Sequence, residues 1–282
     1  MPQTINTNLA SLNAQRNLNA SQSSLQISMQ RLSSGLRVNS AKDDAAGLAI
    51  AERMNSQVRG MNVAIRNAND GISLAQTAEG ALSKVGDSLQ RMRELAIQAR
   101  NATNSSSDKD SLNKEFVELQ KEIARVLGGT TFNGKHILGA DATTLTFQIG
   151  ANTTSDDVIN INTSNMVTDT TITAITSSTM AAIDANATVG AIGNVIDSLD
   201  KAIDLVNDTR ATYGATQSRF DAIISNLQTA VENQSAARSR IMDADYAAET
   251  ANMSRAQILQ QAGTAMVAQA NQLPQQVLKL LG

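Results

Sequence analysis

Residues 54–99 read MNSQVRGMNVAIRNANDGISLAQTAEGALSKVGDSLQRMRELAIQA and decide the fold. One row of apolar or small side chains recurs every seven residues along this stretch: Met54, Met61, Ala68, Ala75, Leu82, Leu89 and Ala96. A second row starts at Val58, fails at Glu79 and resumes at Val85. A repeat of seven predicts a helix that packs against a partner along its whole length. We expect one helix from about 44 to 100, on the order of 80 Å long at ~1.5 Å per residue.

A second long row of the same kind lies in the other half of the chain. Its members are again seven apart: Ile192, Leu199, Val206, Tyr213, Phe220 and Leu227. The row is interrupted at Gln234 before it resumes at Ile241. It predicts a second helix of about 50 residues. The simplest packing places the two halves of the chain antiparallel.

Both ends of the chain carry a shorter version of the pattern, which we call the assembly seam. Its N-terminal members lie in a helix expected over about 5–33 and just beyond it: Leu18, Leu25, Met29, Leu32 and Leu36. The C-terminal members form one row of large and one of small side chains: Leu259, Met266, Leu273 and Leu280, with Ala256, Gly263, Ala270 and Val277. A small row allows a partner helix to approach closely. Pro274 is expected to bend or end the C-terminal helix.

The energetics of these ends predict assembly. A buried Leu contributes ~1.5 to 3 kcal/mol, whereas ordering each residue costs about 1 to 2 kcal/mol. Two terminal helices rich in Ala, Gly, Ser, Asn and Gln do not offset that cost alone, so we expect residues 1–40 and 242–282 to order only when copies of the chain assemble. Contacts between copies that do not close produce a helical filament.

The middle of the chain has a different character. A helix is expected from Asp108 to a left-handed cap at Gly128–Gly129, and Ser40 with Asp43 resembles a capping box that opens the long helix. The FNG triplet at 132–134 signals a turn, and apolar residues alternate over 145–149 and 159–161, which predicts hairpins. Residues 163–188, rich in Thr and Ser, are expected to be an exposed polar surface or loop. The fold class is therefore mainly α: an elongated antiparallel helical bundle and terminal coiled coil with a small β-hairpin region.

Composition excludes several function classes. The 282 residues include no Cys and a single histidine, His136, which follows a turn and is expected on a surface loop. We find no catalytic constellation, cofactor motif or metal cluster, so the sequence does not predict an enzyme. The net charge of −3 and 2% aromatic content argue against a nucleic-acid partner. No apolar stretch is long enough to span a membrane, and the N-terminus does not resemble a cleaved secretory leader.

Long blocks at both ends of the chain resemble bacterial flagellin. They include INTNLASLNAQRNLN, RLSSGLRVNSAKDDAAGLAIA and RNANDGISLAQTAEGAL in the first half, and DADYAAETANMSRAQILQQAGTAMVAQANQLPQQVL in the second. The resemblance implies a secreted, extracellular subunit of the motility filament that is exported through the flagellar type III apparatus. It also implies partners: other copies of the chain, a chaperone at the C-terminal segment, and the filament cap and hook-filament junction proteins.

The resemblance and the patterns together predict three domains. A discontinuous coiled-coil core domain spans 1–43 and 240–282, and a discontinuous helical rod domain spans 44–142 and 190–239. The remaining residues, 143–189, are expected to form a short outer segment, at the place where members of the family that the chain resembles often carry large variable domains. The chain thus resembles a short flagellin.

The stretch QRMRELAIQ at 90–98 resembles the surface that host innate immune receptors recognise on flagellins. Its matching residues are Gln90, Arg91 and Leu95, with Glu115 from the facing helix. Taken without the resemblance, Arg91 is an ordinary solvated helix residue that serves packing or solubility.

Two alternative functions from other classes stay open on the sequence alone. A hook-filament junction protein shares weak similarity at the ends, but the close match in QILQQAGTAMVAQANQ argues against it. An intracellular coiled-coil scaffold would explain the heptads, but not a Thr-rich centre flanked by matched halves.

Overall fold

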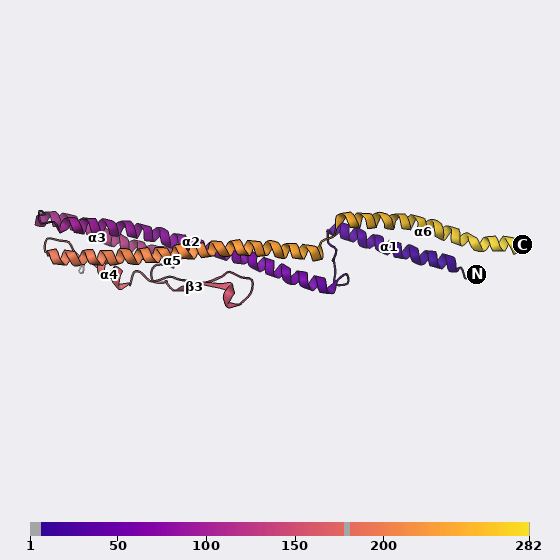
Figure 1. Cartoon of the computed structure of the whole chain (residues 1–282), viewed down its shortest axis with the longest axis horizontal. Helices are drawn as coiled ribbons and strands as arrows, with labels where there is room; N and C mark the ends of the chain where they lie inside the picture. Colours follow the sequence, from indigo (N-terminus) through magenta and orange to yellow (C-terminus); the bar gives the residue numbers. More distant parts are fainter. Residues whose placement is uncertain (1–6, 178–180, 282) are drawn as a thin grey trace. The chain divides into compact units, whose positions relative to one another are not determined.

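The computed structural model describes residues 7–177 and 181–281, with side chains as far as residue 272. Its helices are α1 (Leu9–Ser34), α2 (Ala45–Ala99), α3 (Ser106–Gly129), α4 (Thr170–Thr176), α5 (Val189–Met242) and α6 (Tyr246–Leu281) (Figure 1). Its strands are β1 (Thr131–Phe132), β2 (Lys135–His136), β3 (Thr144–Gln148) and β4 (Val158–Asn162), with a 3₁₀ turn, η1 (Ser155–Asp157), before β4. The expected fold class, mainly helical with small hairpins in the middle of the chain, is confirmed.

The chain divides into two compact units. We call residues 57–231 the central unit, and residues 1–56 with 232–282 the terminal unit. Helices α2 and α5 each contribute to both units, because each crosses a boundary between them.

The central unit is built on the antiparallel pairing of α2 with α5. Arg93 Nε donates to Asp200 Oδ1 at 2.6 Å, and Gln217 Nε2 donates to Glu79 Oε2 at 2.9 Å, so rising numbers on one helix meet falling numbers on the other. The heptad rows predicted for this unit are buried from Met61 to Ala96 and from Ile192 to Phe220, as expected. Helix α3 completes the core with its own apolar face: Phe116, Ile123 and Leu127.

Phe220 joins a hairpin to the two long helices. Its ring packs edge-on to Phe147 of β3, with ring centroids 5.8 Å apart, and is itself fully buried. On the other side, Phe220 occupies the space where a side chain at Gly71 would lie, since a Cβ there would come within 2.7 Å of its Cζ atom. Gly71 is therefore needed for the close approach of the Phe220 ring to the backbone of α2.

We expect Gly71→Ala to destabilise the central unit by up to about 2 kcal/mol. The added methyl overpacks the core by ~1 to 3 kcal/mol, which the better helix propensity of alanine offsets by about 1 kcal/mol. Gly80→Ala is the matched control, because a Cβ at Gly80 meets nothing within 4 Å on the same helix. Urea unfolding should show that Gly80→Ala stabilises slightly; equal effects of both substitutions would contradict this packing.

The two hairpins follow the predicted turn and alternation. Strands β1 and β2 are joined through Asn133 and Gly134, both at positive φ (49° and 78°), the backbone that the FNG triplet favours. Strands β3 and β4 pair antiparallel with Leu145 opposite Ile161 and Phe147 opposite Ile159. The alternating apolar side chains thus share one face, which packs on the central core.

The start of α2 differs from the expectation. Ser40 and Asp43 do hydrogen-bond, with the Ser40 hydroxyl and amide donating to Asp43 Oδ2 at 3.0 and 2.9 Å. That bond closes a turn, however, because the helix begins only at Ala45. The side chain of Asp44 accepts from the Gly47 amide at 2.8 Å and so fills the capping role at the helix start.

Two predicted helix ends also differ. Helix α3 ends at Gly129 without a left-handed residue, because the chain passes directly through extended Thr130 into β1. Helix α6 does not end at Pro274 but continues to Leu281. A proline removes one hydrogen bond, and the remaining bonds of a long helix can carry it past that position.

Within the stretch 163–188, the residues that the structure describes, 163–177 and 181–188, are less exposed than predicted. They include the short helix α4, whose Ile172 and Ile175 are buried in the central core. Gln120 of α3 holds this segment, as its Nε2 donates to the carbonyls of Ile175 and Ala181 at 2.7 and 2.9 Å. Ile172 and Ile175, three residues apart, lie on one face of the helix, and this apolar face is buried although the residues around it are mostly polar.

Candidate functional site

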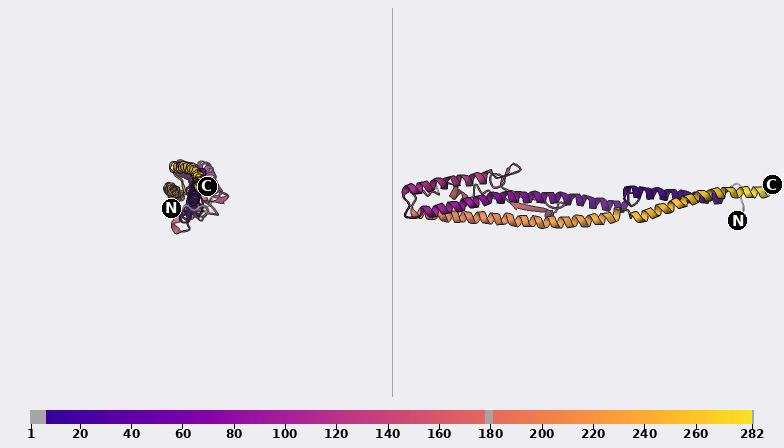
Figure 2. Two further views of the ribbon diagram at one scale, coloured as in Figure 1. Left: turned by 90° about the vertical axis from the view of Figure 1, so that its right-hand side faces the viewer. Right: turned by 90° about the horizontal axis from the view of Figure 1, so that it is seen from above.

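In the terminal unit α1 and α6 pack side by side and antiparallel (Figures 1 and 2). Near one end, Asn8 Nδ2 donates to the Ala270 carbonyl at 2.7 Å. In the middle, Leu18 lies against Gly263, where a Cβ would come within 3.2 Å of its Cδ1 atom. Near the other end, the Ser28 hydroxyl donates to Glu249 Oε1 at 2.5 Å.

Local sequence fixes where these two helices begin and end. Asn8 caps α1 by accepting from the Ser11 amide at 3.0 Å, and Gly35 ends it in the left-handed conformation at φ 72°. Asp245 caps α6 by accepting from the Ala247 and Ala248 amides. The connecting segments are tied together, since the Ala244 amide donates to the Gly35 carbonyl at 2.9 Å.

A small apolar cluster supports this end of the terminal unit. Val38, Ala51 and Met242 are buried together, with Leu36 and Ile241 packed on them. This cluster and the Ala244–Gly35 hydrogen bond hold the C-terminal end of α1 next to the N-terminal end of α6.

The assembly seam separates into two groups in the structure. Leu18, Leu25, Leu32, Leu36 and Gly263 are partly buried, and Ala270 is buried. Met29, Leu259 and Met266 are exposed, with 47%, 50% and 58% of their surface accessible. The side chains of Leu273, Val277 and Leu280 lie outside the described residues.

The small-residue row of α6 is thus the one buried against α1, while Leu259 and Met266 of the large-residue row stay exposed at the edge of the contact. Other apolar side chains of the pair are exposed as well: Leu9, Leu12, Ile27 and Ile258. Within the described side chains of α1 and α6, the only apolar residues that are buried are Ala256 and Ala270. The pair alone therefore has almost no large apolar core.

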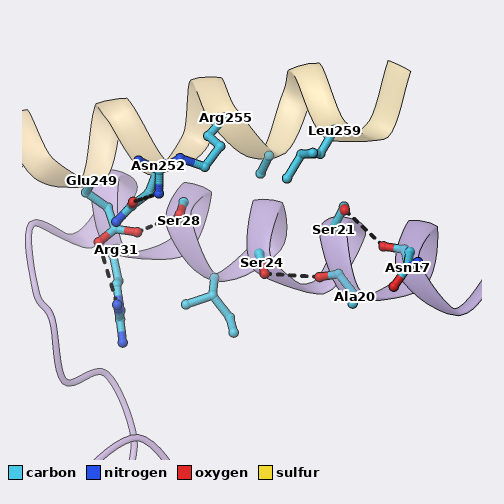
Figure 3. A pocket seen from close by; sticks show the side chains of 12 residues that line it. Asn17, Ala20, Ser21, Ser24, Ser28, Arg31, Glu249, Asn252, Arg255 and Leu259 are labelled. Carbon is cyan, nitrogen blue, oxygen red and sulfur yellow. Dashed lines mark hydrogen bonds and ion pairs between the residues drawn. The ribbon is translucent and has the colours of Figure 1, made fainter. Parts of the chain in front are cut away.

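A groove runs along one side of the pair (Figure 3). It holds about 750 Å³ and is lined by serines and alanines together with Ile27, Leu259, Arg31, Glu249 and Arg255. A second hollow of about 420 Å³ shares Leu259 with the first and extends past it to Met266. Asn17, Ser21 and Leu259 line both hollows, so the two adjoin each other.

Three buried polar residues at the α1–α6 contact were not predicted. Ser11 and Ser28 are 5% and 4% exposed, and Glu249 is 7% exposed. Glu249 also lies 3.6 Å from Arg31 Nη1. A signal was present in the sequence, because Glu249 stands seven residues before Ala256 and so continues the small-residue row.

The second predicted site lies on α2 and α3. Arg91 Nε donates to Glu115 Oε1 at 2.7 Å and its Nη1 to Glu94 Oε2 at 2.9 Å, and these carboxylates raise the pKa of the guanidinium above its usual range. Gln90 is exposed beside them. Leu95 is only 1% exposed and belongs to the central core, so the accessible patch consists of the polar residues.

Among the residues that the structure describes, none of the helices is apolar enough over sufficient length to cross a lipid bilayer.

Comparisons with known proteins identify relatives over the whole chain. The model of the bacterial flagellin N-terminal helical region matches residues 5–143, and that of the C-terminal helical region matches 196–281. Flagellin of Xenorhabdus nematophila is 45% identical, with all of both chains covered. Flagellin of Halalkalibacterium halodurans is 46% identical over 98% of this chain and 99% of its own. The crystal structure of Bacillus cereus flagellin covers 57% of this chain and 88% of its own, at 31% identity and a TM-score of 0.48.

Proposed function

The chain belongs to the bacterial flagellin family, and from this membership we propose that its paired terminal helices form the surface through which copies join. The chain is a structural subunit of the flagellar filament. Its family is one of structural proteins, and filament growth requires each subunit to bind others like itself.

The observation that supports this proposal is the mismatch between the two faces of the α1–α6 pair. The inner face buries only small apolar side chains, whereas Leu259 and Met266 stay exposed along the edge of the groove. Ordering these helices costs about 1 to 2 kcal/mol per residue, which so little burial does not offset. Further copies of the pair would cover the exposed row and supply the missing burial.

Electron microscopy of the purified chain incubated with fragments of its own filaments tests the proposal. We expect the fragments to lengthen as the soluble chain is consumed. Fragments that keep their length in the presence of excess soluble chain would exclude self-assembly under these conditions.

Within this proposal, each of the three predicted domains has its own place in the filament. Residues 1–43 and 240–282 would form the filament core, 44–142 and 190–239 the surrounding helical domain, and 143–189 a short outer segment. Export through the flagellar type III apparatus would place the chain outside the cell. The C-terminal segment would bind an export chaperone, and the filament ends would contact the cap and hook-filament junction proteins.

Recognition by a host innate immune receptor is a second proposal, favoured by the exposed group of Gln90, Arg91 and Glu115. Arg91→Ala is expected to lower receptor-driven reporter signalling by about 30-fold, the effect of losing one central arginine worth ~2 kcal/mol. Lys84→Ala is the matched control, since Lys84 is exposed one heptad earlier on α2. An equal loss of signal from both variants would count against the patch.

A further inference from the structure

We propose that Met266 is an oxidation site that controls assembly: hydrogen peroxide converts its thioether to a sulfoxide in the free chain, and the modified chain no longer joins filaments. This inference rests on the proposed function, because it requires a second copy of the chain to cover Met266. The free chain keeps its fold after the reaction, and the assembled filament resists the oxidant.

Met266 is the most accessible methionine among those whose side chains the structure describes. It is 58% exposed, and Met29 follows with 47%. A dissolved oxidant must reach the sulfur atom, so it modifies these two methionines first. The others with described side chains are partly or fully buried: Met54, Met61, Met92, Met166, Met242 and Met253.

The surroundings of Met266 distinguish it from the other exposed methionine. Leu18, Leu259 and Gly263 lie beside it in one hollow at the edge of the α1–α6 contact, and none of the described residues that line this hollow is charged. Met29 lines neither of the two hollows of the helix pair. Oxidation of Met266 therefore places a polar group on the surface that a second copy covers, and oxidation of Met29 does not.

The reaction transfers one oxygen atom. A lone pair on the Met266 Sδ atom attacks one oxygen of hydrogen peroxide, and the S–O bond forms as the O–O bond breaks. The second oxygen takes the proton of the first and leaves as water. Sulfur is oxidised and the peroxide is reduced, so hydrogen peroxide is the only co-reactant. The product carries an oxygen that accepts hydrogen bonds, in place of an apolar thioether.

A sulfoxide at position 266 has different effects in the free and in the assembled chain. In the free chain more than half of the side chain is exposed, so water solvates the new oxygen and the helix pair is retained. A second copy that covers this row removes that water, and a polar group that loses its hydrogen bonds on burial opposes the contact. The same coverage keeps the oxidant away from Met266 in a finished filament.

The neighbouring member of the row shows which substitution makes a matched control. Leu259 stands seven residues before Met266, is similarly exposed and contains no atom that a peroxide oxidises. The row therefore accepts a leucine. Met266→Leu keeps a large apolar side chain of similar volume at the position and removes the oxidisable sulfur.

Partial oxidation of the unsubstituted chain tests the inference without any substitution. The free chain is treated with hydrogen peroxide until a fraction of Met266 is modified, and catalase then removes the oxidant. The mixture is incubated with filament fragments and sedimented, and peptide mass spectrometry measures the sulfoxide fraction at each methionine in the filaments and in the remaining free chain. Circular dichroism before and after treatment checks that the fold is retained.

We expect the Met266 sulfoxide to be at least about tenfold depleted in the filaments, the ratio that ~1.4 kcal/mol of lost contact energy produces. The Met29 sulfoxide should divide evenly between the two fractions. When Met266 is fully modified, growth should stop in the unsubstituted chain and in Met29→Leu, but continue in Met266→Leu after the same treatment. A thiol-dependent methionine sulfoxide reductase should restore growth of the oxidised unsubstituted chain.

An even distribution of the Met266 sulfoxide would overturn the inference, and so would an equal loss of growth in oxidised Met266→Leu. If Met266→Leu does not join filaments even before treatment, the distribution in the unsubstituted chain decides. Failure of the untreated, unsubstituted chain to lengthen filament fragments would instead overturn the proposed function.

Discussion

Removal of residues 240–282 is expected to abolish filament growth while leaving a helical, folded fragment. The deletion takes away α6 and with it the small-residue row that faces α1, so the paired surface no longer exists. The core of the central unit lies within 57–231 and keeps its large buried side chains, such as Leu82, Phe116 and Tyr213. Sedimentation of the truncated chain after incubation with filament fragments measures the loss.

Circular dichroism and urea unfolding of the same fragment provide the control. A cooperative transition would show that the central unit survives the deletion, and the loss of assembly could then be assigned to the terminal unit. Filaments that form from the truncated chain would show that α6 is dispensable.

The second large effect is expected from the double substitution Leu259→Ser with Met266→Ser. Both side chains are about half exposed in the single chain, so their removal costs the single chain only the burial of the half that is already covered. Burial of the exposed half by a second copy is worth ~1 to 1.5 kcal/mol for each residue. The concentration of free chain in equilibrium with filaments should therefore rise about 30- to 150-fold.

Val63→Ser with Val189→Ser is the matched control for this experiment. These valines are 44% and 53% exposed but lie in the central unit. If the control pair raised the free concentration as much as the terminal pair, general loss of surface hydrophobicity would explain the effect, and the terminal row would have no special role.

The sequence was informative wherever one residue pattern dictates one local structure. The heptad rows from Met61 to Ala96 and from Ile192 to Phe220 predicted two long helices and their buried faces. The FNG triplet predicted a hairpin because few residues other than Asn and Gly adopt positive φ readily.

Periodicity was less informative about which neighbour covers each face. It grouped Leu259 and Met266 with Gly263 and Ala270 in one seam, although in the terminal unit only the small residues are buried against α1. Heptad spacing identifies the rows of side chains on a helix, but which row packs against the partner helix depends on the volumes of the side chains on both sides of the contact. The burial of Leu95 was also missed, because a resemblance compares residue types and does not show which side chains are exposed.

Polar side chains with a distant structural partner could not be placed from the sequence. Glu249 contacts Ser28, 221 residues away, and Gln120 binds carbonyls 55 and 61 residues further on. Neither pairing leaves a local pattern, because each depends on how segments meet in the folded chain. The buried position of α4 likewise depends on distant residues, because Ile172 and Ile175 pack in the core of the central unit.

The central claim is that a second copy of the chain covers the exposed row of α6, and labelling of Met266→Cys with a maleimide tests it most directly. The chain has no other cysteine, and position 266 is 58% exposed in the single chain, so the soluble protein should react rapidly. In filaments the account predicts that labelling nearly stops and returns when the filaments are dissociated. Equal labelling rates in soluble chain and filaments would contradict it.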